Sequence, residues 1–105
     1  MFELLFTDES LSIFNQLKKT AGTKKGSKQE GLLKQVKKTL KFLAADPRHP
    51  GLHTHEYSGL PHPWNKHQKV FEAYVQNKTP GAYRLFWCYG PEKHQITIIT
   101  ILQHP

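Results

Sequence analysis

The sequence predicts one α+β domain in which an N-terminal strand and a helical hairpin pack on an antiparallel sheet, in the order β-α-α-β-β-β. Three observations predict it. A chain of 105 residues suits a single domain, spanning residues 1–105 without internal repeats. Apolar residues recur at helical spacing in its first half. The last third instead shows strand-like runs separated by turn residues.

The first two elements are a short apolar segment and a helix. Phe2 to Phe6 form an apolar run that fits a first strand or the lead-in to a helix. Thr7 is a capping residue, and acids follow in the first turn, where the helix dipole favours them. Leu11, Ile13, Phe14 and Leu17 continue the pattern toward a helix that ends near Lys19. Residues 21–27 are rich in Gly and Lys and predict a turn.

A second helix is predicted over roughly residues 28–45. Its apolar stripe consists of Leu32, Leu33, Val36, Leu40 and Leu43. Pro47 cannot continue the helix, and the short connection to the first helix predicts an antiparallel hairpin. Residues 46–68 fit neither helix nor strand, and a loop this long is usually functional or mobile. It equally fits a packed surface crossing, with Leu52, Tyr57, Leu60 and Trp64 as anchors.

Three strands are predicted over residues 69–75, 82–89 and 95–102, with turns between them. Alternation assigns their faces. One face should pack under the helices and carries Phe71, Ala73, Val75, Leu85 and Trp87. The single cysteine, Cys88, excludes an internal disulfide and a cysteine-based zinc site, and we expect a small buried side chain.

The opposite face carries Glu72, Tyr74 and Arg84, which we expect to project outward. An arginine inside an apolar strand costs too much to bury unpaired, so it must face solvent, a partner or an anionic substrate. Two interpretations remain. Glu72 and Arg84 form a cross-strand ion pair on a solvated face, which is worth little. Alternatively, carboxylate, phenol and guanidinium line a shallow cleft, where the arginine binds a phosphate or a developing oxyanion.

Histidines supply two further candidates. His104 follows the last predicted strand, where it either reaches the same face and transfers protons or belongs to a frayed tail. His53, Thr54, His55 and Glu56 invite a metal hypothesis, with three more histidines nearby. The H-x-H spacing is common by chance and no helix fixes these imidazoles, so we expect polar loop residues and neither metal nor other cofactor.

The chain is strongly basic, with 15 Lys and Arg against 8 Asp and Glu and a net charge of +7. This balance favours a nucleic acid, an acidic protein or an anionic membrane surface as partner, against a basic surface kept for solubility. The candidate RNA-binding residues are Lys34, Lys37, Lys38, Lys41, Lys66, His67 and Lys69. The N-terminus does not resemble a signal peptide, and no apolar run could span a bilayer, so we expect a cytoplasmic protein without a membrane partner.

Three segments resemble the RelE/ParE superfamily of type II toxin–antitoxin systems. They are residues 47–52 with 58–60, residues 70–75, and residues 81–87, which are similar to the "YRLxY" strand of that family. The resemblance implies the β-α-α-β-β-β fold and a cognate antitoxin as partner. It also implies a toxin of RelE type, a ribosome-dependent endoribonuclease that cleaves mRNA without a metal.

In that branch the 2′-hydroxyl attacks the adjacent phosphate. By position Arg84 matches the phosphate-stabilising arginine of the family, and His104 lies near the C-terminal catalytic histidine of some members. Glu72 and Lys69 have looser counterparts, and Tyr74 joins the expected site through its place on the strand. Two alternatives stay open: a ParE-like inhibitor of DNA gyrase, and a non-catalytic member that only binds RNA or its partner.

Overall fold

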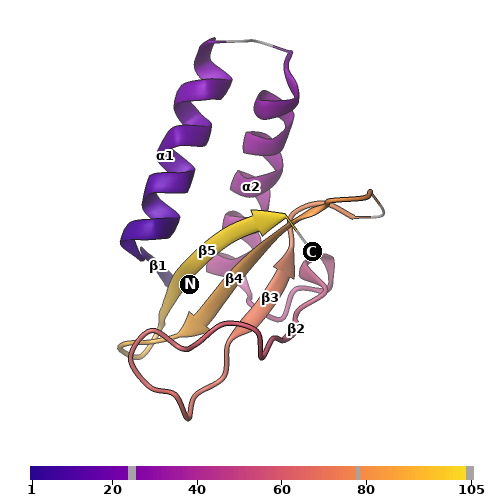
Figure 1. Ribbon diagram of the computed structural model, residues 1–105. Helices are drawn as coiled ribbons and strands as arrows, with labels where there is room; N and C mark the ends of the chain where they lie inside the picture. The colour runs from indigo at the N-terminus through magenta and orange to yellow at the C-terminus, as the bar shows by residue number, and fades with distance from the viewer. Residues whose placement is uncertain (24–25, 78, 104–105) are drawn as a thin grey trace.

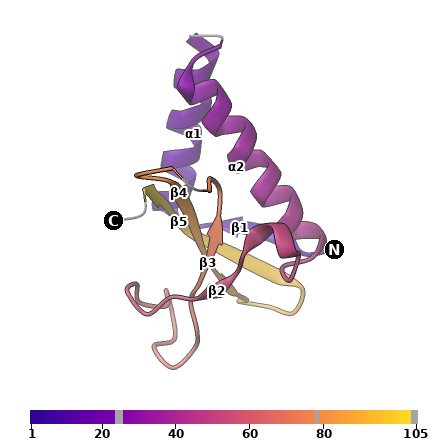
Figure 2. The same ribbon diagram turned by 90° about the vertical axis from the view of Figure 1, so that its right-hand side faces the viewer.

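The computed structural model describes residues 1–23, 26–77 and 79–103 (Figures 1 and 2). Its elements are β1 (Glu3–Phe6), α1 (Asp8–Thr23), α2 (Lys28–Ala45), the 3₁₀ turn η1 (Pro50–Leu52), β2 (His55–Glu56), β3 (Phe71–Tyr74), β4 (Tyr83–Tyr89) and β5 (Gln95–Gln103). The five strands form one sheet in the order β1-β5-β4-β3-β2. The α1–α2 hairpin covers one face of this sheet, so the predicted α+β architecture is confirmed.

The sheet is mixed rather than wholly antiparallel. Strands β2 to β5 pair antiparallel, as predicted, whereas β1 lies parallel to β5 at the edge. Two parallel strands need a long connection between them. The connection from β1 to β5 begins with the helical hairpin. Strand direction depends on the path of the whole chain, so a local pattern of apolar residues does not reveal it.

Thr7 fastens the start of α1 to β5. Its hydroxyl oxygen accepts from the backbone N–H of Ser10 at 3.1 Å and its own hydrogen is donated to the carbonyl of Ile99 at 2.7 Å. The buried hydroxyl of Ser10 donates to the carbonyl of Ile98 at 2.7 Å. The predicted cap is therefore confirmed, and it also joins helix to sheet.

The second helix has the predicted bounds, and its N-cap is Ser27, whose hydroxyl accepts from the Glu30 N–H at 3.3 Å. The first helix is longer than predicted. It ends at Thr23 rather than near Lys19, so residues 21–23, which were expected in a turn, are helical. Ala21 is buried against the rest of the hairpin, so packing outweighs the low helix propensity of the glycine that follows.

The core lies between the helices and the sheet. Its buried members are Val36, Leu40, Leu43, Leu52, Ala73, Val75, Leu85, Trp87, Ile96, Ile98 and Ile101. Phe71 packs against this cluster from the same strand face, so the predicted inward face of β3 and β4 is confirmed. Leu11 is 44% exposed and lies outside the core, contrary to the predicted stripe of the first helix. Among the described helices, none is long and apolar enough to cross a membrane.

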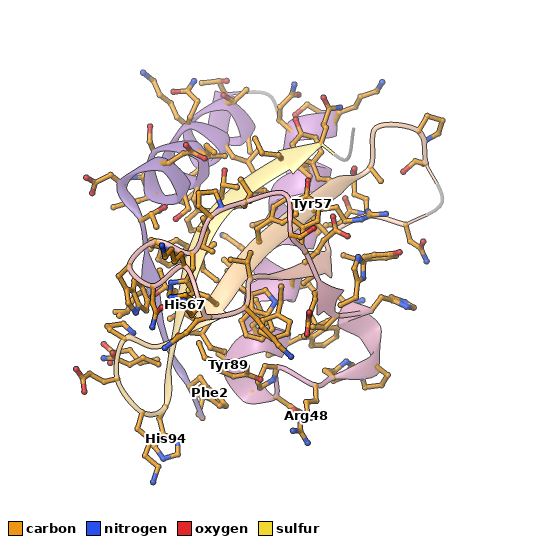
Figure 3. All side chains as sticks on the ribbon, turned by 60° about the horizontal axis from the view of Figure 1, so that its bottom comes forward. Phe2, Arg48, Tyr57, His67, Tyr89 and His94 are labelled. Atoms are coloured by element: carbon orange, nitrogen blue, oxygen red, sulfur yellow. The ribbon has the colours of Figure 1, made fainter. Side chains whose placement is uncertain are left out.

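Residues 57–70 cross the outer face of the sheet, away from the helices (Figures 2 and 3). The ring of Tyr57 packs on Phe86 of β4, with 4.7 Å between centroids. Tyr57 also folds over Gly59, where a Cβ would lie 2.5 Å from the phenol oxygen, so a larger residue there would displace the Tyr57 ring. The loop is therefore packed against the sheet through Tyr57, and Leu52 is buried as expected, whereas the expected anchor Trp64 is 45% exposed.

Cys88 gives a direct test of this packing. It is fully buried on β4, and burial raises the pKa of its thiol to about 11. Because the thiolate is the reactive form, we expect the folded protein to resist a disulfide reagent at about pH 8. One thiol per chain should react after unfolding in guanidinium, as followed by absorbance. Rapid modification of the native protein would contradict the burial of Cys88.

Candidate active site on the outer face of the sheet

The candidate site is built on β2, β3 and β4. Strand pairing sets His55 opposite Glu72, and Tyr74 opposite Arg84. Glu72, Tyr74 and Arg84 share the face that points away from the helices, as alternation predicts. Their exposure differs from the prediction, because Glu72 is only 1% exposed and Arg84 only 9%. Because both side chains are buried, neither the solvated ion pair nor the open cleft describes the site.

Arg84 is buried and is held to the protein through one nitrogen of its guanidinium group. Its Nη1 donates to the carbonyl of Gln76 at 2.5 Å and to that of Tyr83 at 3.2 Å. The guanidinium carbon lies 3.7 Å from the centroid of the Tyr74 ring, a favourable cation–π geometry. Its Nε is buried without a hydrogen-bond partner among the described residues. Arg84 therefore fixes the Tyr74 ring and fastens the end of the β3–β4 hairpin.

His55 and Glu72 form a closely coupled pair. The Nε2 of His55 lies 2.5 Å from Oε1 of Glu72, and its Nδ1 lies 3.1 Å from the carbonyl oxygen of His53. A carbonyl oxygen only accepts hydrogen bonds, so Nδ1 can bond to it only in a state in which that nitrogen carries a hydrogen. In the other tautomer Nε2 donates its hydrogen to the carboxylate of Glu72, and Nδ1 carries a lone pair that can accept a proton.

This pair can move a proton to or from a ligand. The side chain of His55 is 50% exposed, whereas that of Glu72 is 2% exposed, so the buried carboxylate orients an imidazole that solvent can reach. The bond from Nδ1 to the carbonyl of His53 is exposed and ordinary in length, so a ligand oxygen can compete for that nitrogen. Histidine is the side chain best suited to proton transfer near neutral pH.

Tyr74 stands at the centre of the cluster. The ring of His53 packs 4.9 Å from it, and the ring of His55 approaches its edge at 6.1 Å. His53 has a positive φ of 49°, a conformation that non-glycine residues seldom adopt and that often marks functional sites. The two histidines of the H-x-H segment thus flank a phenol. Among the residues that the structure describes, no group of three side chains could hold a metal ion.

Sequence analysis did not assign His53 and His55 to this site. Their spacing suggested metal ligands, and β2 is only two residues long, too short for an alternating pattern. The signal that points to them is non-local, because His55 meets Glu72 only through the pairing of β2 with β3. The expected catalytic residue His104 lies outside the described residues.

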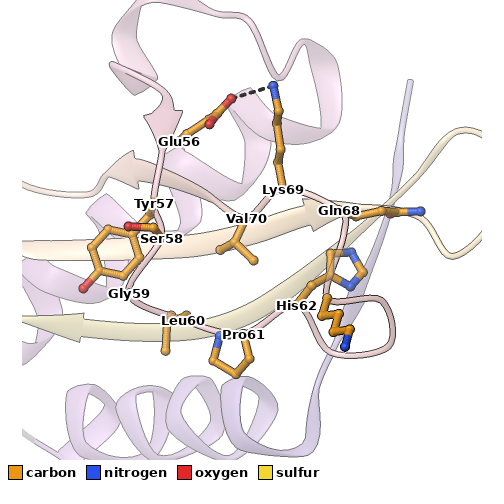
Figure 4. Close-up of a pocket in the computed structure, with 11 residues that line it drawn as sticks. Glu56, Tyr57, Ser58, Gly59, Leu60, Pro61, His62, Gln68, Lys69 and Val70 are labelled. Carbon is orange, nitrogen blue, oxygen red and sulfur yellow. Dashed lines mark ion pairs between the residues drawn. The ribbon is translucent and has the colours of Figure 1, made fainter.

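Two of the expected RNA-binding lysines share a cavity of about 690 Å³ next to the site (Figure 4). Lys66 and Lys69 line it together with Tyr57 and the buried His62. Lys69 pairs with Glu56 at 2.7 Å, and the hydrogen bond and charge of this carboxylate raise the pKa of the lysine. The neighbouring His67 is exposed, as expected for a surface contact.

The remaining expected RNA-binding residues lie elsewhere. They are Lys34, Lys37, Lys38 and Lys41, all exposed on α2. Because α2 packs on the inner face of the sheet, these lysines belong to the opposite layer from Glu72 and Arg84. The structure therefore separates two basic regions that the sequence had grouped together.

Comparison with known proteins relates this architecture to solved toxins. No protein-family model and no curated protein matches the sequence. A YoeB/ParE toxin from Agrobacterium tumefaciens aligns with 99% of this chain and 100% of its own, with a TM-score of 0.64 and 9% identity. A chain of the intact E. coli RelBE toxin–antitoxin complex aligns with 100% of this chain and 99% of its own, with a TM-score of 0.60 and 17% identity.

A third match is a chain of the archaeal RelE–RelB complex from Pyrococcus horikoshii OT3. It aligns with 97% of this chain and 93% of its own, with a TM-score of 0.61 and 10% identity. The chain has the RelE/ParE toxin fold. The match extends over the whole domain, so the outer-face cluster is embedded in a complete RelE/ParE fold rather than in a shared fragment.

The loop that closes this site should be sensitive to acid through His62. This residue is 8% exposed, and its Nδ1 accepts from the N–H groups of Trp64 at 3.2 Å and Asn65 at 3.1 Å. Both bonds need an unprotonated Nδ1, and burial lowers the pKa of His62 from its ordinary 6.5. The stabilisation is therefore complete above about pH 6.5 and declines below it, because the unfolded chain gains the proton first.

We expect amide hydrogen exchange in residues 57–70, corrected for its intrinsic pH dependence, to speed up as the pH falls below about 6.5. His62→Asn is the matched control, because its amide oxygen can accept the same two hydrogen bonds and does not titrate. The explanation fails if the variant responds to acid as strongly as the wild type.

Proposed function

We propose that this protein is the toxin of a type II toxin–antitoxin pair, and that it cleaves mRNA on the ribosome without a metal ion. One observation carries the proposal: the close contact between His55 and the buried Glu72, beside Tyr74, on the outer face of a RelE/ParE fold. The structural neighbours support the toxin role, since they are a YoeB/ParE toxin and two RelE–RelB-type assemblies. The expected partners are a cognate antitoxin and the translating ribosome.

In the proposed reaction the 2′-hydroxyl of the substrate attacks the adjacent phosphorus. When Nδ1 of His55 is unprotonated, it accepts the proton of that hydroxyl while Glu72 stabilises the resulting imidazolium. A bond forms between the 2′-oxygen and phosphorus, the bond to the 5′-oxygen breaks, and that oxygen takes a proton from water. The imidazolium of His55 gives its proton to the hydroxide that remains, which restores the base. The products are a 2′,3′-cyclic phosphate and a free 5′-hydroxyl.

The other expected site residues take supporting roles in this proposal. Arg84 holds Tyr74 in place rather than binding phosphate, because its Nη1 already donates to two carbonyls. Lys66 and Lys69, exposed on the segment that follows β2, contact the RNA phosphates. The lysines of α2 then contact more distant RNA of the ribosome or the antitoxin, since both carry negative charge.

The burial of Arg84 also favours a second candidate. An arginine held on backbone carbonyls contributes less to phosphate chemistry than an exposed one, which suits a toxin that acts by binding alone. A ParE-like inhibitor of DNA gyrase, or a member that only binds RNA or its partner, fits this observation. The experiments below separate these alternatives from the ribonuclease.

Replacing His55 tests the proposed chemistry. We expect His55→Ala to slow mRNA cleavage in a translating extract by about 10²- to 10⁴-fold, the usual loss for a general acid–base residue. Cleavage sites can be mapped by primer extension, with circular dichroism to verify folding. The matched control is His94→Asn, which changes an exposed histidine outside the site at a positive φ that asparagine tolerates. Equal cleavage by wild type and His55→Ala would exclude the proposed base.

Expression of the chain alone in a bacterium tests the toxin role. We expect growth arrest with inhibited translation, relieved by co-expression of a small acidic protein encoded beside it. Normal growth at high soluble expression would contradict a toxin of either kind. Arrest that persists in His55→Ala, with inhibited DNA supercoiling in place of inhibited translation, would identify the gyrase inhibitor.

A further inference from the structure

A second cavity, of about 490 Å³, lies where the loop after α2 meets the ends of β3 and β4. Its floor is aromatic and consists of Phe71, Trp87 and Tyr89. Its rim is basic and consists of Arg48, His49 and His53. Arg48 and Tyr89 lie at the same end of the molecule in Figure 3. This size falls within the range of small-ligand sites.

The floor offers the partly exposed rings of Phe71 and Tyr89 and a buried donor. Phe71 and Trp87 stack with centroids 4.8 Å apart and an interplanar angle of 27°, and Tyr89 meets Trp87 edge-on at 4.9 Å. Tyr89 is 41% exposed, so the aromatic cluster reaches solvent. Trp87 is 1% exposed, and its Nε1 has no hydrogen-bond partner among the described residues. A buried N–H without an acceptor is costly and uncommon, so this one calls for an explanation.

The rim favours an anion. Arg48 is exposed, and no carboxylate is among the described residues that line the cavity. The nearby carboxylate of Asp46 accepts from the backbone N–H of Arg48 at 2.9 Å. The Nδ1 of His49 accepts from the Gly51 N–H at 2.9 Å, so a neutral His49 ring carries its hydrogen on Nε2 and remains a donor. Positive and donor groups therefore surround an aromatic floor.

The cavity borders the candidate active site through His53. The ring of His53 lines the cavity and also packs 4.9 Å from Tyr74, which is next to His55. A ligand in the cavity would therefore lie close to a second ligand group that contacts His55. A polymer that runs past the edge of the sheet at β2 can occupy both places at once.

We infer that this cavity binds one nucleotide of single-stranded RNA, adjacent to the nucleotide that is cleaved. The base stacks on the aromatic floor and an acceptor atom of the base takes the hydrogen of Trp87 Nε1, while Arg48 and His49 hold the phosphate. The inference rests on the proposed ribonuclease function for its choice of RNA. A single aromatic slot with a basic rim also suits an acidic side chain of a protein partner, but continuity with the His55–Glu72 pair favours the nucleotide.

Nuclear magnetic resonance of the ¹⁵N-labelled protein tests this directly, using uridine 5′-monophosphate as the probe. The chain has two tryptophans, so the Trp87 indole signal can be assigned by removing the other with Trp64→Phe. Titration should shift the Trp87 indole signal and leave that of Trp64, which does not line the cavity, unchanged. Ribose 5-phosphate, which has no base, should shift the Trp87 signal much less.

Variants test the basic rim and the aromatic floor of the cavity separately. Arg48→Gln should weaken binding of uridine 5′-monophosphate about 10-fold, the usual effect of losing one charged hydrogen bond. Lys93→Gln is the matched control, because it removes the same charge from an exposed residue that does not line the cavity. Trp87→Phe keeps an aromatic floor but removes the N–H. It should therefore reduce the difference in affinity between uridine 5′-monophosphate and ribose 5-phosphate.

The inference is overturned if uridine 5′-monophosphate leaves the Trp87 signal in place, or if ribose 5-phosphate shifts it equally. It is also overturned if only a glutamate-rich peptide shifts the signal, which would indicate a protein partner. Its failure can be told apart from failure of the proposed function. Binding needs no catalysis, so uridine 5′-monophosphate should still shift the Trp87 signal in His55→Ala. If the wild type shows this shift but cleaves no mRNA, the nucleotide site stands and the proposed ribonuclease function fails.

Discussion

The contact between His55 and Glu72 is the constraint on which the outer face depends. A carboxylate that is 1% exposed needs compensation, and the only short strand of the long loop places an imidazole directly opposite it in register, as far as the described residues show. This pairing fixes β2 on the edge of β3 and brings the following segment back across the sheet. The position of His53, the orientation of His55 and the closed surroundings of Tyr74 all follow from that one attachment.

Covering the second face changes what the cations of this protein can do. Arg84 is buried and is held by backbone carbonyls and the Tyr74 ring, so it contributes order and local positive potential. Among the exposed cations, Lys66 and Lys69 line one of the two cavities described above and Arg48 lines the other. The proposals therefore give positioning and phosphate binding to different residues, whereas a single arginine could do both on an open sheet.

Most of the fold followed from local patterns, and the errors have a common cause. The bounds of α2, the cap at Thr7 and the inward face of β3 and β4 depend on neighbours within a few residues, and they were predicted correctly. The direction of β1, the length of α1 and the burial of Arg84 depend on contacts distant in sequence. Alternation found Glu72 and Tyr74, but nothing local could pair Glu72 with a histidine 17 positions away across a loop of prolines and glycines.

The edge of the sheet at β2 gives the two proposals a common geometry. The His55–Glu72 pair belongs to the outer face, whereas Phe71 and Trp87 belong to the face that packs under the helices. His53 stands between them at a positive φ, which lets the chain turn around the edge of β3. A strand of RNA that contacts both sites must bend around that edge, and its two neighbouring bases cannot remain stacked on each other. Duplex RNA cannot bend in this way, so under both proposals the protein would select single strands, such as an unpaired stretch of a message on the ribosome.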